Sequence, residues 1–285
     1  GWTLCVFARF LCGPFAYSLS CPFIKHSAVT QETPEVSLIK FDAVPDIRLI
    51  ACDMDGTLLD DEDAIHQDFW PLIEELHGRG VTFCPASGRQ YYNLLQRFEA
   101  IADDLIFIAE NGSFVVQKGE EISSDCLARD VAQELTRAAR ALSASGADIG
   151  VVLCGKRSAY IERSDPAFFA EVDKYYQRLE VVDDLQAVED EVLKFAVFAF
   201  DSSERVCAPA FARFRATHQV VVSGQHWLDV MAPSVNKGAG IRHIQQSLGI
   251  TPEQTMVFGD FLNDLEMMDQ ARYSFAMANA HPQLK

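Results

Sequence analysis

The sequence has little positive charge and no long apolar run. Its 285 residues include 24 Lys and Arg against 41 Asp and Glu, which gives a formal net charge of −17 at pH 7. So acidic a chain is a poor general partner for nucleic acids or anionic membranes, which attract basic surfaces. No apolar run reaches the roughly 20 residues that span a bilayer. The sequence therefore predicts neither nucleic-acid binding nor stable membrane association.

The eight cysteines form no metal-binding or redox pattern. No two of them are spaced as C-x-x-C, and the absence of this spacing argues against a structural zinc site. Several stand in apolar strand-like segments, where a free thiol behaves as a small hydrophobe. We therefore expect reduced, buried thiols and a cytoplasmic protein. The positions are Cys5, Cys12, Cys21, Cys52, Cys84, Cys126, Cys154 and Cys207.

Both ends of the chain differ from the rest of it. Residues 1–24 are apolar and aromatic, but an arginine, a glycine and a proline interrupt them, and residues 25–46 have the composition of a linker. We expect residues 1–46 to be an N-terminal extension that is poorly ordered or not native to the domain. A secreted or membrane-anchored form remains an alternative if residues 1–24 are authentic. The sequence stops soon after a strand-like run, which indicates a chain truncated at its C-terminus.

Strand and helix patterns alternate in two separated parts of the chain. Apolar runs at 49–52, 81–84 and 105–109 each end in polar or glycine-rich residues, with helical apolar spacing between them. This pattern is typical of a parallel sheet covered on both faces, and so of the α/β class. The pattern resumes near residue 236, and we expect the strand at 255–258 to join the same sheet. The other predicted elements here are helices at 65–77, 236–248 and 262–270 and a strand at 273–277.

The middle of the chain has a different rhythm. From about residue 114 to 226, strands and helices do not alternate regularly, which indicates an α+β unit with mostly antiparallel strands. We expect this unit to be an inserted domain over 118–224, so that the core consists of 47–117 and 225–285. The predicted helices of the insert are 127–144, 167–179 and 204–215, and its predicted strands are 149–153, 159–161, 192–200, 219–223 and 227–231.

Polar residues gather where the core strands end, the edge at which open α/β sheets bind ligands. Asp53-Met54-Asp55-Gly56-Thr57 follows the first strand. Two carboxylates so close together repel each other, and a divalent cation would offset that repulsion. The alternative is an Asx-turn with solvated acids. On the functional interpretation, Asp53 is a carboxylate nucleophile and Asp55 is a general acid and base.

Three further segments belong to the same edge. Gly259-Asp260-Phe261-Leu262-Asn263-Asp264 adds acids whose oxygens suit magnesium, although an ordinary helix N-cap is the alternative. Ser87-Gly88-Arg89 offers a hydroxyl and backbone N–H groups to a phosphate, or is only a turn. Lys237 begins a helix, where a cation opposes the helix dipole. At this edge, a role in anion binding explains Lys237 better than solvation does.

These segments, in this order, resemble motifs I to IV of the haloacid dehalogenase (HAD) superfamily. Glu110-Asn111-Gly112 and Ala276-Met277-Ala278-Asn279-Ala280 are similar to signatures of its Cof-type phosphatases, subclass IIB. The resemblance covers about residues 47–285. It implies a Rossmann-like core with a cap domain inserted between motifs II and III. It also implies magnesium-dependent hydrolysis of phosphomonoesters through an aspartyl-phosphate.

The resemblance implies roles for single residues as well. Asp53 would be the nucleophile and a metal ligand, Asp55 would be the acid and base and a ligand through its backbone oxygen, and Asp260 would be the other metal ligand. Lys237 would also be catalytic, and Asp264 would support the site. The residues expected to bind the phosphoryl group or substrate are Ser87, Gly88, Arg89, Lys237 and Asn263.

One departure from the family pattern lies in motif IV. A small or polar residue usually follows Gly-Asp, and Phe261 stands there instead, which we expect to reshape the pocket floor without touching the ligands. Our main hypothesis is a phosphatase for a small phosphorylated metabolite, such as a sugar phosphate or a cofactor phosphate. A phosphomutase that shares the aspartyl-phosphate and a catalytically inactive binding module are the alternatives. The sequence identifies neither the substrate nor the oligomeric state.

Overall fold

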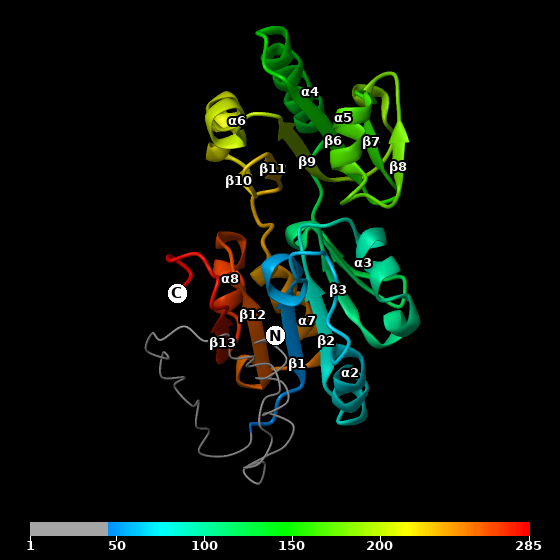
Figure 1. Cartoon of the computed structure of the whole chain (residues 1–285), viewed down its shortest axis with the longest axis vertical. Helices are drawn as coiled ribbons and strands as arrows, with labels where there is room; N and C mark the ends of the chain where they lie inside the picture. Colours follow the sequence, from blue (N-terminus) through cyan, green and yellow to red (C-terminus); the bar gives the residue numbers. More distant parts are fainter. Residues whose placement is uncertain (1–44) are drawn as a thin grey trace, which may run out of the picture.

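The structure is a computed structural model, and it describes residues 45–285. The expected N-terminal extension therefore lies outside the described residues, apart from its last two positions. Within the described part, the strands form two sheets, which Figure 1 shows one above the other with two chain segments joining them. We call the domain of the seven-stranded sheet the core and the domain of the six-stranded sheet the cap.

The core sheet has the strand order β13-β12-β1-β2-β3-β4-β5. β1 pairs in parallel with both β12 and β2, which confirms that these three segments share one sheet. β13 and β3 continue the parallel arrangement on either side, and only the last two strands are antiparallel. The strands are β1 (Leu49–Asp53), β2 (Thr82–Ala86), β3 (Ile106–Ala109), β4 (Phe114–Gln117), β5 (Glu120–Ser124), β12 (Thr255–Gly259) and β13 (Tyr273–Ala276).

Helices cover both faces of the core sheet, as the apolar runs of its central strands predict. Alternate residues of β1 point to opposite sides: Ile50 packs with the helices α2 and α3, and Ala51 packs with α7 and α8. α2 begins at Phe69 instead of the expected residue 65, because Ile65 forms an antiparallel bridge with Leu59 in the preceding loop. The helices are α2 (Phe69–Gly78), α3 (Tyr91–Arg97), α7 (Lys237–Leu248) and α8 (Leu265–Met268), with 3₁₀ turns at Glu99–Asp104, Glu110–Gly112, Pro252–Gln254 and Leu262–Asp264.

The cap is an α+β unit whose sheet has the order β10-β11-β9-β6-β7-β8. All of its neighbouring strands are antiparallel except β7 and β8. Helices α4 and α6 pack on one face of this sheet and α5 on the other. Its elements are α4 (Arg129–Ala144), β6 (Ile149–Gly155), β7 (Ala159–Ile161), α5 (Pro166–Val172), β8 (Leu179–Val181), β9 (Val192–Ala199), α6 (Ser203–Phe211), β10 (Gln219–Val222) and β11 (Trp227–Met231), with 3₁₀ turns at Leu185–Ala187 and Ala212–Ala216.

Sheet membership corrects the expected limits of the insert, 118 and 224. Lys118 and Gly119 both have positive φ angles, 53° and 78°, and turn the chain back so that β5 pairs with β4 in the core. At the other end, β11 pairs with β9 of the cap. The insert therefore begins after Ser124 and ends near Met231. The expected helix over 167–179 also stops early, because β8 begins at Leu179 and pairs with β7.

The five described cysteines are free thiols, and four of them are buried, as expected from their apolar surroundings. Burial raises the pKa of Cys207 to about 11. Cys5, Cys12 and Cys21 lie outside the described residues, and the cytoplasmic location inferred from the cysteines stays a prediction. Among residues 45–285, no helix is both long enough and apolar enough to cross a bilayer.

Candidate active site

The candidate site lies at the carboxyl ends of β1 and β12, which are neighbours in the core sheet. β1 ends at Asp53, Asp260 directly follows β12, and α7 begins at Lys237. The Lys237 amine is fully buried, forms an ion pair with Asp53, and donates to Asp264 Oδ1 at 2.7 Å. Residues from motifs I, III and IV, up to 211 positions apart in the sequence, thus meet at one sheet edge, as the motif analysis predicted.

Three carboxylates form the centre of this site. One oxygen each of Asp53, Asp260 and Asp264 lies within 4.8 Å of the other two. With Lys237 as their buried counter-ion, three negative charges face one positive charge, so two negative charges are uncompensated. Burial raises the pKa of Asp53 far above its usual range; Lys237 opposes this shift, and the repulsion of Asp264 and Asp260 adds to it. For Lys237, burial acts against the charged form, but the attraction of Asp264 and Asp53 outweighs it and raises the pKa.

The cluster has the donor atoms that a divalent cation needs. Its donors are all carboxylate oxygens, which Mg²⁺ prefers, and two charges remain to be neutralised. A Cβ atom at Gly56 would lie 2.3 Å from Asp260 Oδ2, so only glycine leaves room there, and its φ of 80° also favours glycine. Asp264 is less available as a ligand, because its Oδ2 accepts the backbone N–H groups of Asp260 and Phe261 at 3.0 and 3.1 Å. Asp53 and Asp260 are the side chains that fit a metal best.

The Asp55 carboxylate is not among the three clustered carboxylates and is bound by Arg89. The guanidinium donates to both oxygens, from Nε at 3.0 Å and from Nη2 at 2.5 Å, and also contacts Asp63 at 2.7 Å. The ring of Tyr175, from the cap, lies 5.2 Å from this guanidinium. Arg89 therefore orients Asp55 in this arrangement. Two expectations stay predictions: that Arg89 contacts a phosphate, and that the backbone oxygen of Asp55 binds the metal.

The Ser87-Gly88-Arg89 segment forms a tight loop after β2. Ser87 is buried, and its Oγ accepts the backbone N–H of Arg89 at 3.1 Å, so the hydroxyl proton is left to donate to a ligand. The Ser87 carbonyl accepts the N–H of Asn111 at 2.9 Å, and the Arg89 carbonyl accepts that of Glu110 at 3.0 Å. The loop is thus fixed on both sides by the chain that follows β3.

Three residues contribute to the site that the sequence analysis gave no role. The Thr57 hydroxyl donates to Asp260 at 3.2 Å, and the Asn279 amide donates to the Gly56 carbonyl at 2.9 Å. Asn111, with φ of 59°, accepts from the amide of Asn263 at 3.2 Å. Thr57, Asn111 and Asn279 all lie in the quoted motifs, so the family signatures were the signal for them.

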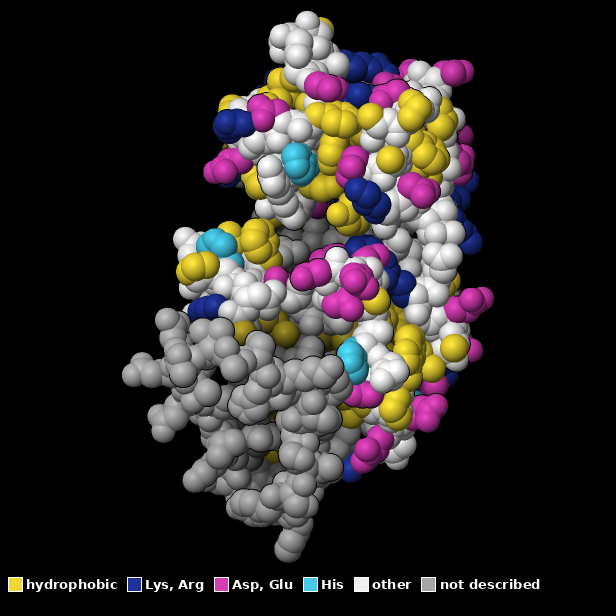
Figure 2. All heavy atoms as spheres, in the orientation of Figure 1, with side chains coloured by type: hydrophobic (Ala, Val, Ile, Leu, Met, Phe, Trp, Pro, Cys, Tyr) yellow, Lys and Arg dark blue, Asp and Glu magenta, His cyan; other side chains and the backbone are white. Residues whose placement is uncertain are grey.

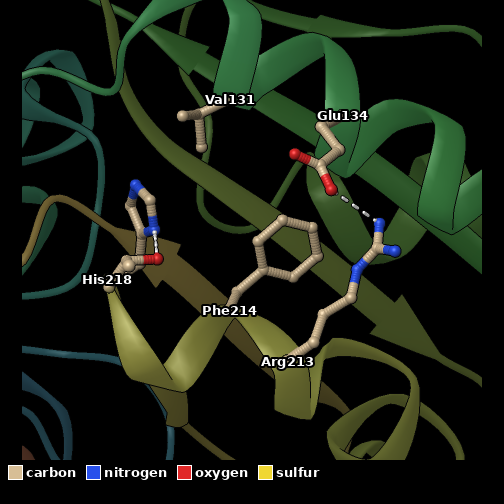
Figure 3. Close-up of a pocket in the computed structure, with 6 residues that line it drawn as sticks. Val131, Glu134, Arg213, Phe214 and His218 are labelled. Carbon is tan, nitrogen blue, oxygen red and sulfur yellow. Dashed lines mark hydrogen bonds and ion pairs between the residues drawn. The ribbon is translucent and has the colours of Figure 1, made fainter.

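Two other features lie apart from the chemistry. Phe261 is 38% exposed and its ring lies 5.7 Å from that of His281, so its side chain packs at the surface beside the cluster. A cavity of about 350 Å³ opens on the cap, where Arg213 pairs with Glu134 beside the ring of Phe214 (Figure 3). This cavity is formed by α4 and the turn after α6, and none of the motif residues lines it. Figure 2 shows a separate hollow between the cap and the core.

The fold and the acidic cluster define an α/β domain with an inserted cap and a carboxylate site at the edge of its parallel sheet. The family profile described as haloacid dehalogenase-like hydrolase matches residues 50–285. The chain is 37% identical over 244 residues to the 5-amino-6-(5-phospho-D-ribitylamino)uracil phosphatase YbjI of Escherichia coli K12, covering 82% of this chain and 86% of that protein. It is 29% identical over 239 residues to the HMP-PP phosphatase of Cronobacter sakazakii, covering 83% and 86%.

A solved structure described as an HAD subclass IIB sugar phosphatase has the same fold. It superposes with a TM-score of 0.70 at 21% identity, covering 83% of this chain and 90% of that one. The chain belongs to the haloacid dehalogenase-like hydrolase family. It is a phosphomonoester hydrolase of that family, the class that the resemblance of its motifs implied.

Proposed function

We propose that this enzyme hydrolyses a small phosphorylated metabolite with the help of Mg²⁺ and through an aspartyl-phosphate on Asp53. The observation that carries the proposal is the cluster of Asp53, Asp260 and Asp264 around the buried Lys237 at the ends of β1 and β12. A phosphate monoester would be repelled by this cluster unless a cation offset its charge. Bound Mg²⁺ would supply that charge and polarise the phosphoryl oxygens.

The first half of the reaction uses both acids of motif I. A carboxylate oxygen of Asp53 attacks phosphorus and forms an acyl phosphate, while the bond between phosphorus and the substrate oxygen breaks. Asp55 gives its proton to the leaving oxygen, so the product departs as an alcohol. Both Asp55 oxygens accept from Arg89 in the structure, so this step requires Asp55 to give up at least one of these hydrogen bonds. Lys237 and the Ser87 hydroxyl stabilise the charge on the transferred group.

Water completes the reaction. Asp55, now a carboxylate, accepts a proton from a water molecule as that water attacks the phosphorus of the acyl phosphate. The bond between phosphorus and the Asp53 oxygen breaks, which releases inorganic phosphate and restores both acids. A phosphomutase would instead pass the phosphoryl group to a second hydroxyl of the substrate, so release of inorganic phosphate separates the two reactions.

The relatives support a substrate with the phosphate on a small polar carrier. The E. coli relative is named for a phosphate at position 5 of a ribityl chain attached to a uracil. We propose a substrate of this class, in which a primary phosphate ester ends a polyol or sugar chain. We expect the cap residues that face the core to determine which of these esters the enzyme prefers.

A panel assay tests the proposal. Purified enzyme is incubated with polyol phosphates, sugar phosphates and p-nitrophenyl phosphate, with Mg²⁺ or with EDTA, and inorganic phosphate is measured. We expect turnover with Mg²⁺, none with EDTA, and none for Asp53→Asn. Full activity in EDTA would refute the role of the metal, and normal turnover of Asp53→Asn would refute the nucleophile.

A further inference from the structure

A second buried lysine lies where the cap meets the core. Lys194 belongs to β9 of the cap sheet, in which all eight residues are buried, and its side chain is 3% exposed. A lysine is almost never fully buried unless it is paired. Its amine donates to the carbonyl oxygen of Gly88 at 2.8 Å. Gly88 belongs to the Ser87-Gly88-Arg89 segment of the core, the proposed phosphate-binding loop. A cap side chain thus makes a direct contact with motif II.

The same amine carries two ion pairs. It lies 2.8 Å from Glu110 Oε2 in the core and 3.6 Å from Asp229 Oδ2 in β11 of the cap. Both acids are buried, at 1% and 3% exposure. Burial opposes the charge of Lys194, but the attraction of Asp229 and Glu110 outweighs it and raises the lysine's pKa. These contacts hold an ammonium group at one defined place beside the loop.

Peptide geometry carries the contact from Lys194 to the Ser87 hydroxyl. The Gly88 carbonyl and the Arg89 N–H belong to one planar peptide group, in which they point in opposite directions. Lys194 binds the carbonyl at one end, and the N–H at the other end donates to Ser87 Oγ at 3.1 Å. Rotation of this peptide plane would break both bonds together. The Lys194 contact therefore keeps the hydroxyl oxygen engaged and its proton directed elsewhere.

Asp229 extends the contact to motif IV. It accepts the side-chain amide of Asn111 at 3.1 Å, and Asn111 accepts the amide of Asn263 at 3.2 Å. Glu110, Asn111 and Gly112 have φ of 49°, 59° and 103°, a left-handed run that surrounding contacts must hold in place. The cap charges thus meet the core at a strained loop that touches two motifs.

We propose that Lys194 is a positioning residue for phosphate binding: the cap lysine fixes the Gly88–Arg89 peptide and thereby the Ser87 hydroxyl that contacts the phosphoryl group. The phosphate-binding loop of the core is then complete only when the cap is seated on it. This inference rests on the proposed phosphatase function, because it assigns a role within the same site.

The test compares two lysines that both join cap and core. Lys194→Met removes the contact with the loop. Lys156→Met is the matched control, because Lys156, in the turn between β6 and β7, pairs with Glu121 of the core strand β5 at 2.8 Å and with Glu191 of the cap at 3.3 Å, and both acids lie outside the motif loops. For each protein we would measure kcat and KM with p-nitrophenyl phosphate and Mg²⁺, the inhibition constant of inorganic phosphate, and the melting temperature.

Loss of the loop contact should weaken catalysis beyond any loss of stability. We expect Lys194→Met to lower kcat/KM about 10²-fold, since small misplacements of this kind have effects of that order. We also expect it to raise the inhibition constant of inorganic phosphate at least several-fold. Lys156→Met should keep both values within about twofold of the wild type, even if its melting temperature falls.

Lys194→Met leaves two buried acids without their cation and could fail to fold. A triple variant, Lys194→Met, Glu110→Gln and Asp229→Asn, removes all three charges, and such neutral replacements are often tolerated. We expect it to melt near the wild-type temperature and still bind phosphate weakly. An active wild type together with a triple variant as active as Lys156→Met would overturn this inference alone. An inactive wild type would overturn the proposed function and this inference with it.

Discussion

Replacing Asp53 by asparagine should stabilise the metal-free protein while it abolishes turnover. Asp53 is almost fully buried and faces the carboxylates of Asp260 and Asp264 and the ammonium of Lys237. Lys237 offsets one of the two repulsions that Asp53 meets, and the other remains. Asparagine has nearly the same shape, keeps an oxygen that accepts from Lys237, and carries no charge. The substitution therefore removes one uncompensated repulsion and the only proposed nucleophile together.

The size of the effect follows from the spacing of the cluster. Two unit charges 4.8 Å apart repel by about 3.5 kcal/mol at an effective dielectric constant of about 20. The hydrogen bond to Lys237 loses its charge on one side, which gives back about 1–2 kcal/mol. The net gain is about 1.5–2.5 kcal/mol, or roughly 3–10 °C in melting temperature. Without metal, the catalytically dead variant should be the more stable protein.

The gain should depend on pH in a defined direction. The pKa of Asp53 is raised in the folded protein, chiefly by burial, above its value in the unfolded chain. Its contribution to stability is therefore complete below the unfolded pKa, near 4, and is lost as the pH rises through the folded pKa. Asparagine does not titrate. The advantage of Asp53→Asn in EDTA should vanish near pH 4 and grow as the pH rises.

Magnesium should reverse the order of stability. A ligand that binds only the folded state at 100 times its dissociation constant stabilises it by about 2.7 kcal/mol. The wild type should gain this amount, and Asp53→Asn should gain little, because it lacks a charged ligand. Thermal unfolding at pH 8 gives the stability of the wild type and of Asp53→Asn, each in EDTA and in Mg²⁺. As a control, Asp201→Asn in the exposed cap surface should change each value by less than about 0.5 kcal/mol. A variant that is less stable than the wild type in EDTA, or equally stabilised by Mg²⁺, would refute the charge argument.

Three further outcomes follow from the site and the core. Asp55→Asn should lower turnover about 10²–10⁴-fold and, with p-nitrophenyl phosphate, accumulate a phosphoryl group on the peptide that contains Asp53; mass spectrometry that finds it on another peptide would identify a different nucleophile. Gly56→Ala should lose the Mg²⁺-dependent rise in melting temperature, because its Cβ would lie 2.3 Å from Asp260 Oδ2, whereas Gly80→Ala, with φ of 75° and no atom within 4 Å, should show backbone strain only and keep the rise. Among the described thiols of the native protein, Cys126 should react first with a thiol reagent, since Cys52, Cys84, Cys154 and Cys207 are buried; peptide mapping after brief labelling checks this order.

The central core strands could be predicted from the sequence because they are almost entirely apolar. Burial on both faces produces such runs, and the structure confirms β1, β2 and β12 as parallel neighbours. The β4–β5 hairpin was missed because β5 is partly exposed and reads as a polar segment. Its turn, Lys118-Gly119, was the local signal, since a two-residue hairpin turn of this kind places both residues at positive φ. Because this hairpin was missed, the expected start of the insert, residue 118, was placed too early.

The elements of the cap were harder to delimit where tertiary pairing decides the outcome. Helical spacing continues past Val172, but the chain leaves the helix there and forms β8 against β7. Likewise Ile65 has helical spacing with the residues after it, yet it pairs with Leu59. Neither pairing partner can be identified from local periodicity, because the choice depends on contacts between separate segments.

The two buried lysines show what sequence reasoning about this site found and what it missed. Lys237 attracted notice because it begins a helix at the sheet edge where the motif acids lie. Lys194 stands in the run Val192–Ala199, whose other seven residues are apolar, and it was passed over as part of a strand. Yet the physical argument is the same for both: an ammonium group inside a buried element needs acids around it. The structure supplies Asp53 and Asp264 to Lys237, and Glu110 and Asp229 to Lys194. A single charged residue in an otherwise apolar strand is therefore as informative about a site as a charged residue in a motif, and here Lys194 connects the cap to the Ser87-Gly88-Arg89 loop of the core.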